Sequence, residues 1–239
     1  MLTPPWSMVH HSTHWGRWWN WVVNGYVNVI AWFMRRWPGV TPRLMRISTA
    51  VVRPWQRVVP IHEATHYRAC IEVVKQLGCV EFGFAVDPEF ERVRVAWAIV
   101  QACIDRWAAR GRYPINLTVN LRFVGRSDCL LSPANGNDHT CFIEVLGDGS
   151  TPDWSAVVDE LALAWQRALP GCRPHWPKQH ASVPDIAASV RAALGDRLDR
   201  FVALHERLEV DPNHVLRNAY LDRMLFDEPA GPGSQSMPL

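Results

Sequence analysis

The sequence predicts an α+β protein in which an antiparallel sheet has helices packed on one side. Strand-like alternation of apolar residues occurs near residues 80–86 and 115–123, and an apolar, strand-like segment lies near 140–146. Segments with the 3.6-residue apolar period of helices lie between and after them. Because their order lacks the regular strand–helix–strand spacing of a parallel sheet, an antiparallel sheet is favoured.

Residues 1–60 form a Trp-rich segment that we expect to be helical or irregular, and that holds eight of the chain's 13 tryptophans. Polar residues such as Asn20, Asn24 and Asn28 interrupt its apolar run, so no stretch of about 20 apolar residues could span a bilayer. A secretory signal is also not indicated, since no small-residue cleavage site follows. Two interpretations remain: a helix that covers a domain, or peripheral membrane contact through residues 15–37.

Regular patterns begin after the Trp-rich segment. Apolar residues from Ala69 to Leu77 follow a helical period, which predicts a helix ending at Gly78. A strand follows near 80–86. Asp87 and Pro88 then predict the start of a helix that continues to Gly111. Its apolar stripe consists of Val93, Ala96, Trp97, Val100, Cys103, Ile104 and Trp107.

The clearest strand is "INLTVNLRF", residues 115–123. Its apolar residues share one face, while Thr118, Asn120 and Arg122 share the other. After the strand near 140–146, helices are expected from Thr151–Pro152 onward and then near 184–194 and 196–209. The tail from about residue 228 is rich in Pro, Gly and Ser, and we expect it to be disordered.

The composition excludes some classes of partner. A formal net charge of +2, dispersed along the chain, does not indicate nucleic-acid binding. The 6 cysteines form no C-x-x-C pair and suit buried thiols in a reducing compartment. A cytoplasmic protein, with membrane association left open, is therefore expected.

Residues His62-Glu63-Ala64-Thr65-His66 match H-E-x-x-H, the zinc-binding string of metallopeptidases. The match is weak because Pro60 would place the first histidine in the first helical turn. His66 also lies on the apolar stripe of the predicted helix, as a buried structural histidine would. We expect no metal site, and a zinc hydrolase is kept as the minor alternative.

The second half carries a more specific signal. "RPHWPKQH" (173–180) resembles the R-P-H-W-G-K-x-H signature of the sugar-lactone and alditol oxidases, which are flavoenzymes of the vanillyl-alcohol-oxidase type. Three further segments resemble that family in the same order, so the resemblance covers about residues 61–225. They are "VEFGFAVDPEF" (80–90), "VNLRFVGRSDCLLSPANGNDHTCFIEV" (119–145) and "LEVDPNHVLRNAYLDRML" (208–225).

The resemblance implies that the chain is the substrate-binding, or cap, half of such an oxidase. The family oxidises an alcohol or lactone by hydride transfer to FAD, and dioxygen reoxidises the flavin. It implies a cap domain over residues 61–170 and a region over 171–239 that closes on the flavin. The implied catalytic residues are Arg122, His175 and Lys178. The implied substrate-binding residues are Asn120, Thr118 and Trp176, and the implied cofactor-binding residues are His175, Lys178 and Asn218.

Two positions depart from the family pattern. Asn120 stands where the family has Glu, and Pro177 replaces the Gly of its H-W-G-K motif. These changes keep a more apolar, sterol-like alcohol open as a substrate. Residues 1–60 contain no glycine-rich pyrophosphate loop. We therefore expect the FAD-binding domain to be either the missing N-terminal half of a longer protein, of which this chain is a fragment, or a separate chain, and we expect the chain to be inactive without it. The alternative is a non-catalytic remnant or a membrane-associated interaction module.

Overall fold

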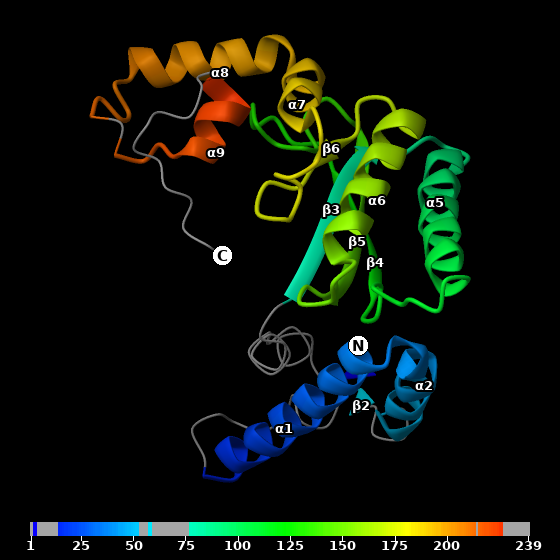
Figure 1. Ribbon diagram of the computed structural model, residues 1–239. Helices are drawn as coiled ribbons and strands as arrows, with labels where there is room; N and C mark the ends of the chain where they lie inside the picture. The colour runs from blue at the N-terminus through cyan, green and yellow to red at the C-terminus, as the bar shows by residue number, and fades with distance from the viewer. Residues whose placement is uncertain (1, 4–13, 53–56, 59–76, 214, 227–239) are drawn as a thin grey trace. The chain divides into compact units, whose positions relative to one another are not determined.

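The computed structural model describes residues 2–3, 14–52, 57–58, 77–213 and 215–226 (Figure 1). They fall within two compact units. One unit draws on residues 1–79, 102–118 and 146–157, and the other on residues 80–101, 119–145 and 158–239. Several strands and helices run from one unit into the other, so the units do not follow simple cuts along the chain.

The Trp-rich segment is mainly helical where it is described, as predicted, and it also holds two short strands. It contains β1 (Leu2–Thr3), α1 (His14–Arg36), the 3₁₀ helix η2 (Pro38–Val40), α2 (Thr41–Val52) and β2 (Arg57–Val58). β1 and β2 pair antiparallel. Arg35 in the last turn of α1 donates to Asp148 at 2.9 Å, and its charge also complements the negative end of the helix dipole.

No helix in the described part of the chain combines the length and apolarity needed to cross a bilayer. The polar interruptions of α1 predict this result. Peripheral membrane contact through residues 15–37 stays a prediction.

The predicted antiparallel sheet is confirmed. Its strands are β3 (Leu77–Ala85), β4 (Val119–Gly125), β5 (His139–Asp148) and β6 (Arg173–Pro174). Their spatial order is β4-β5-β3-β6. β4 pairs antiparallel with β5, and β6 with β3.

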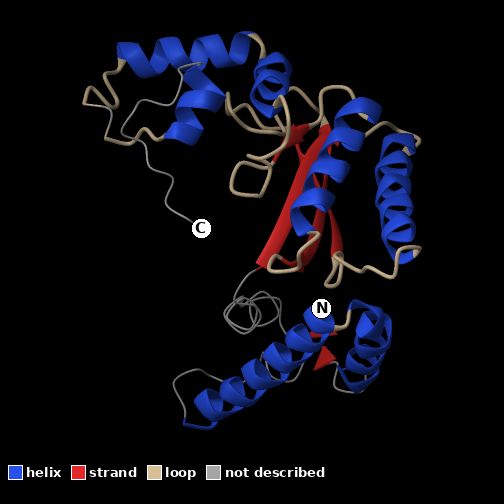
Figure 2. Ribbon diagram, viewed as in Figure 1, coloured by secondary structure: helices blue, strands red, loops and turns tan. Residues whose placement is uncertain are grey.

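Two helices cover one face of this sheet, α5 (Glu91–Ala108) and α6 (Trp154–Ala168) (Figure 2). The ring of Trp165 in α6 packs 5.7 Å from that of Phe82 in β3, and its indole N–H donates to the Ala96 carbonyl in α5 at 3.2 Å. The apolar residues of β3 and β5 that face these helices are fully buried. They are Val80, Phe82, Phe84, Ile143 and Val145.

The C-terminal part is helical, as predicted. α7 (Ile186–Leu194) and α8 (Asp196–Arg207) meet at Gly195, whose φ of 52° suits glycine. α9 (Ala219–Leu221) and the π-helix η4 (Asp222–Phe226) follow. The tail predicted to be disordered, from about residue 228, lies outside the described residues.

The prediction that Gly78 ends a helix is wrong, because β3 already begins at Leu77. A Cβ at Gly78 would overlap the Trp154 ring, and one at Gly147 would lie 2.6 Å from that ring. These two glycines make room for the indole. Most of the predicted helix, together with the H-E-x-x-H string, lies outside the described residues.

Helix α5 begins at Glu91, three residues later than Asp87–Pro88 predicts. The Asp87 carboxylate still accepts from the backbone N–H groups of Glu91 and Arg92, each at 2.8 Å. The intervening residues form a turn in which Phe90 has a φ of 57°. The capping residue was thus identified correctly and the helix start was not.

Two other expectations need correction. β4 begins at Val119 rather than near 115, and the Asn116 side chain instead accepts from the Asp148 N–H at 2.9 Å. Cys129 is exposed, whereas Cys79, Cys103, Cys141 and Cys172 are buried as predicted. Cys129 lies in the loop between β4 and β5, where side chains face solvent.

Candidate functional site

The face of the sheet opposite α5 and α6 carries charged side chains from three strands. Successive strand residues point to opposite faces, so Glu81 lies opposite Phe82, and Glu144 opposite Ile143 and Val145. In the register, Asn120 pairs with Glu144 and Arg122 with Phe142. We call this surface the charged face, formed by Glu81, Asn120, Arg122, Phe142, Glu144, His175 and Lys178.

Arg122 and Glu81 form an ion pair across the sheet. The Glu81 side chain is fully buried and accepts from Arg122 Nη2, whereas the Arg122 side chain is 52% exposed. The guanidinium passes over the ring of Phe142, 5.9 Å from its centroid. Gly83 makes this path possible, because a Cβ there would lie 2.7 Å from the Phe142 ring. The charged face therefore carries a guanidinium that is held by buried Glu81 and that solvent can still reach.

His175 contacts the same phenylalanine. Its backbone N–H donates to the Glu81 carbonyl at 2.9 Å, and its ring meets Phe142 edge-on at 5.6 Å. Nδ1 is 3.7 Å from Glu81 Oε2. Both of these atoms are buried and make no hydrogen bond within the described residues.

Burial lowers the pKa of His175 below its ordinary 6.5. The negative charge of Glu81 opposes this shift, while the positive charges of Arg122 and Lys178 reinforce it. The imidazole is therefore neutral at pH 7, and a neutral imidazole can accept a proton.

Glu144 accepts hydrogen bonds from two further polar residues of the charged face, Lys178 and Asn120. One of its carboxylate oxygens accepts from Lys178 Nζ at 2.9 Å, and the other accepts from Asn120 Nδ2 at 2.9 Å. The Glu144 side chain is mostly buried. The ammonium group and the amide are thereby fixed beside each other.

The structure brings four of the predicted site residues together: Arg122, His175, Lys178 and Asn120. The structure shows hydrogen bonds of the other three outside the charged face. The Thr118 carbonyl accepts from Leu146 N at 2.9 Å, and Trp176 Nε1 donates to the Leu131 carbonyl at 2.7 Å. Asn218 caps α9 by accepting from Leu221 N at 3.0 Å. The roles predicted for these three rest on the family motifs.

Sequence reasoning missed Glu81, Glu144 and Phe142. A signal for the two acids was present, since each stands alone between apolar strand residues. A carboxylate in a buried strand must be paired or lie on a polar face. Without the strand pairing, however, the sequence does not show that both carboxylates face Arg122 and Lys178.

Among the described residues, no group of three His, Cys, Asp or Glu side chains could hold a metal ion. The H-E-x-x-H string lies outside those residues, so its minor zinc interpretation stays open.

Comparison with known protein families agrees with the resemblance that the sequence motifs carry. A family model described as D-arabinono-1,4-lactone oxidase matches residues 4–224. The chain belongs to the D-arabinono-1,4-lactone oxidase family. The match begins within the Trp-rich segment, so the family region extends beyond the 61–225 covered by the motifs.

Two curated relatives are each named L-gulono-1,4-lactone dehydrogenase. They come from Mycobacterium tuberculosis strains CDC 1551 / Oshkosh and ATCC 25618 / H37Rv. Each is 29% identical to this chain over 204 residues, which is 84% of this chain and 42% of the relative. The chain thus spans less than half the length of these relatives.

Proposed function

We propose that this member of the D-arabinono-1,4-lactone oxidase family is the substrate-binding part of an FAD-dependent oxidoreductase that oxidises a CH–OH group of an aldonolactone. The observation that carries the proposal is the convergence of Arg122, His175 and Lys178 on one face of the sheet. The names of the family and of its relatives support a lactone substrate.

The charged face suits a flavin. It offers an accessible guanidinium that lies over an aromatic ring. His175 and Lys178 would hold the cofactor, and Asn218 is assigned to it by motif alone. FAD, when bound, supplies the acceptor for a hydride. An FAD-binding domain, on the same or another chain, is the partner that this proposal requires.

Arg122 would bind the substrate oxygen and stabilise negative charge on it. A guanidinium presents a rigid fork of donors, and one aimed at a developing charge lowers the barrier. Its ion pair with buried Glu81 fixes the direction of the fork. Lys178, fixed by Glu144, adds a second positive charge on the same face.

His175 would accept the proton of the substrate hydroxyl. Because Nδ1 faces the Glu81 carboxylate, the tautomer with the proton on Nδ1 is favoured. Nε2 is then the nitrogen that can accept a proton. The lowered pKa of His175 keeps the imidazole neutral and ready for this role near pH 7.

The position of Glu144 favours a polar substrate over an apolar one. Asn120 replaces the carboxylate of the family pattern, but its amide donates to Glu144 from the neighbouring strand. A carboxylate is therefore still held within reach of position 120. Such a polar surface suits the hydroxyl groups of a lactone better than an apolar, sterol-like alcohol.

The electron acceptor has two candidates. The family description, an oxidase, supports dioxygen with release of hydrogen peroxide. The relatives' name, dehydrogenase, supports a different acceptor. Peroxide release measured in parallel with reduction of an acceptor dye under argon distinguishes the two.

The test joins this chain to an FAD-binding domain of the family and supplies aldonolactones, alditols and sterols. Lactone oxidation is expected, with Arg122→Ala lowering kcat/KM by about 10²- to 10³-fold. Arg126→Ala is the matched control, since Arg126 lies just beyond β4 and, among the described residues, forms an ion pair only with exposed Asp128. Equal losses in both variants would contradict the role of Arg122, whereas no turnover of any substrate with flavin bound would favour the non-catalytic remnant instead.

A further inference from the structure

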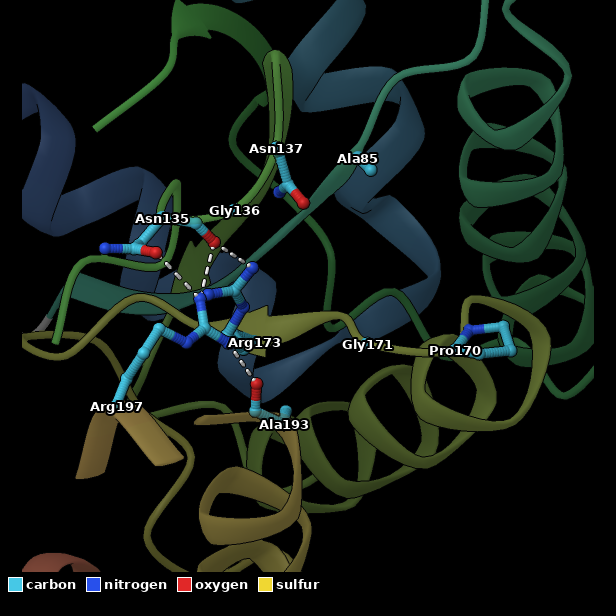
Figure 3. Close-up of a pocket in the computed structure, with 9 residues that line it drawn as sticks. All are labelled: Ala85, Asn135, Gly136, Asn137, Pro170, Gly171, Arg173, Ala193 and Arg197. Atoms are coloured by element: carbon cyan, nitrogen blue, oxygen red, sulfur yellow. Dashed lines mark hydrogen bonds between the residues drawn. The ribbon is translucent and has the colours of Figure 1, made fainter. Parts of the chain in front are cut away.

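A cavity of about 350 Å³ opens near the C-terminal end of β3, apart from the charged face (Figure 3). It shares no residue with the charged face. Ala85, which lines it, is four residues beyond Glu81 on β3, or about 13 Å along the strand. The other lining residues are Asn135, Gly136, Asn137, Pro170, Gly171, Arg173, Ala193 and Arg197.

Two arginines from different elements meet in this cavity. Arg173 of β6 donates to the carbonyls of Asn135 at 2.8 Å and Ser132 at 3.3 Å. Arg197 of α8 donates to the same Asn135 carbonyl at 2.7 Å and to the Asn135 side-chain oxygen at 3.1 Å. Figure 3 shows the two guanidiniums side by side at this carbonyl.

Every acceptor that these two guanidiniums have in the described structure is neutral. Arg197 makes its other bonds to the carbonyls of Leu194 and Ala193. No Asp or Glu lines the cavity, and neither arginine takes part in an ion pair among the described residues. The cavity therefore holds two positive charges for which the described residues supply no counter-ion.

Of the two arginines, Arg173 has the less favourable surroundings for a positive charge. It is only 5% exposed, and its Nε is buried without a hydrogen bond in the described part of the chain. Burial, followed by the positive charge of Arg197, lowers the pKa of Arg173 to about 10. A buried charge without a partner is costly, so an anion in the cavity would offset that cost.

We propose that this cavity binds the phosphate group of a small phosphorylated molecule. Paired guanidinium forks match phosphate oxygens in charge and in geometry. The cavity volume lies at the lower end of the roughly 300–1,000 Å³ typical of ligand pockets, which leaves space beyond the phosphate itself. Gly136 keeps the wall open, because a Cβ there would lie 3.3 Å from Arg197 Nη1.

Isothermal titration calorimetry of the purified chain tests the proposal, because it requires neither flavin nor turnover. The probes are inorganic phosphate and glycerol 3-phosphate, with chloride used to hold the ionic strength constant. Saturable binding is expected, and Arg197→Gln should weaken it about 10- to 100-fold. Arg200→Gln is the matched control, since Arg200 lies on the exposed side of the same helix and does not line the cavity.

The two probes separate the sources of phosphate. Tighter binding of glycerol 3-phosphate supports a phosphorylated metabolite, whereas tighter binding of inorganic phosphate contradicts this proposal and indicates a site for the free ion. Absence of saturable binding, or an equal effect of the two glutamine variants, overturns the proposal. Should Arg197→Gln unfold by circular dichroism, Arg197→Lys replaces it. Lysine keeps the charge and loses the fork, so unchanged affinity would contradict recognition by paired forks.

Discussion

The two faces of the sheet use the same strands for opposite purposes. Phe82 and Glu81 are neighbours in β3, and both are completely buried. Phe82 is buried against Trp165 and the helices, whereas Glu81 is buried beneath Arg122. Burial alone therefore does not distinguish a core residue from a site residue. The side-chain partner does.

The two faces also differ in what they contribute, since the helix-covered face stabilises the fold and the charged face carries the groups proposed for the chemistry. On the helix-covered face, packing of apolar surface supplies the folding free energy. On the charged face, ion pairs with a half-exposed arginine contribute little, because solvent screens them. Substitutions on the first face should unfold the protein, and those on the second should change its chemistry.

The largest expected effect tests the helix-covered face. Trp165→Ala removes the side chain that joins β3, α5 and α6, so the free energy of unfolding should fall by about 3 to 5 kcal/mol. Urea unfolding followed by circular dichroism measures the change. Phe123→Ala on the edge strand is the control. Its side chain is 54% exposed, so it should lose less than about 1 kcal/mol.

A smaller effect is expected from acid, which should lower the stability of the protein through the buried His180. Five residues beyond His175, burial lowers the pKa of His180 from 6.5 to about 4, and its Nε2 is hydrogen-bonded to the Tyr220 hydroxyl at 2.7 Å. A histidine with a lowered folded-state pKa binds its proton more readily when unfolded. Stability is therefore complete above about pH 6.5 and is lost as the pH falls towards 4.

The expected loss from His180 alone is about 3 kcal/mol between pH 7 and pH 4. His180→Gln should flatten the pH dependence of the unfolding free energy over this range. His139→Gln, at an exposed position, should leave it unchanged. An equal acid sensitivity of the wild type and His180→Gln would show that this histidine is not the responsible group.

The smallest expected effect sharpens the description of the charged face. Glu81→Gln keeps an acceptor for Arg122 and removes the negative charge that raises the pKa of His175. The pKa of His175 should therefore fall further, while the free energy of unfolding changes by less than about 2 kcal/mol. NMR titration of the imidazole resonances measures the pKa. A higher pKa in this variant would mean that Glu81 does not face His175 as the structure has it.

Local signals predicted the element types better than their ends. The predicted capping role of Asp87 is confirmed, but the helix begins only at Glu91, after Phe90. Gly78 looked like a helix stop and is a strand residue, because the glycine accommodates a tryptophan 76 residues later in the chain. Packing against a residue far along the chain decided the outcome at Gly78, and no local pattern contains that information.

The sequence alone determined which residues alternate, because strand side chains repeat every two residues, and so it placed Asn120 and Arg122 on one face. It also carried the motif that contains His175 and Lys178. Only the tertiary structure brought Glu81 under Arg122 and Glu144 beside Lys178, since these contacts join residues 41 and 34 positions apart. Which strand lies beside which, and in what register, is set by long-range hydrogen bonds and by packing against the helices.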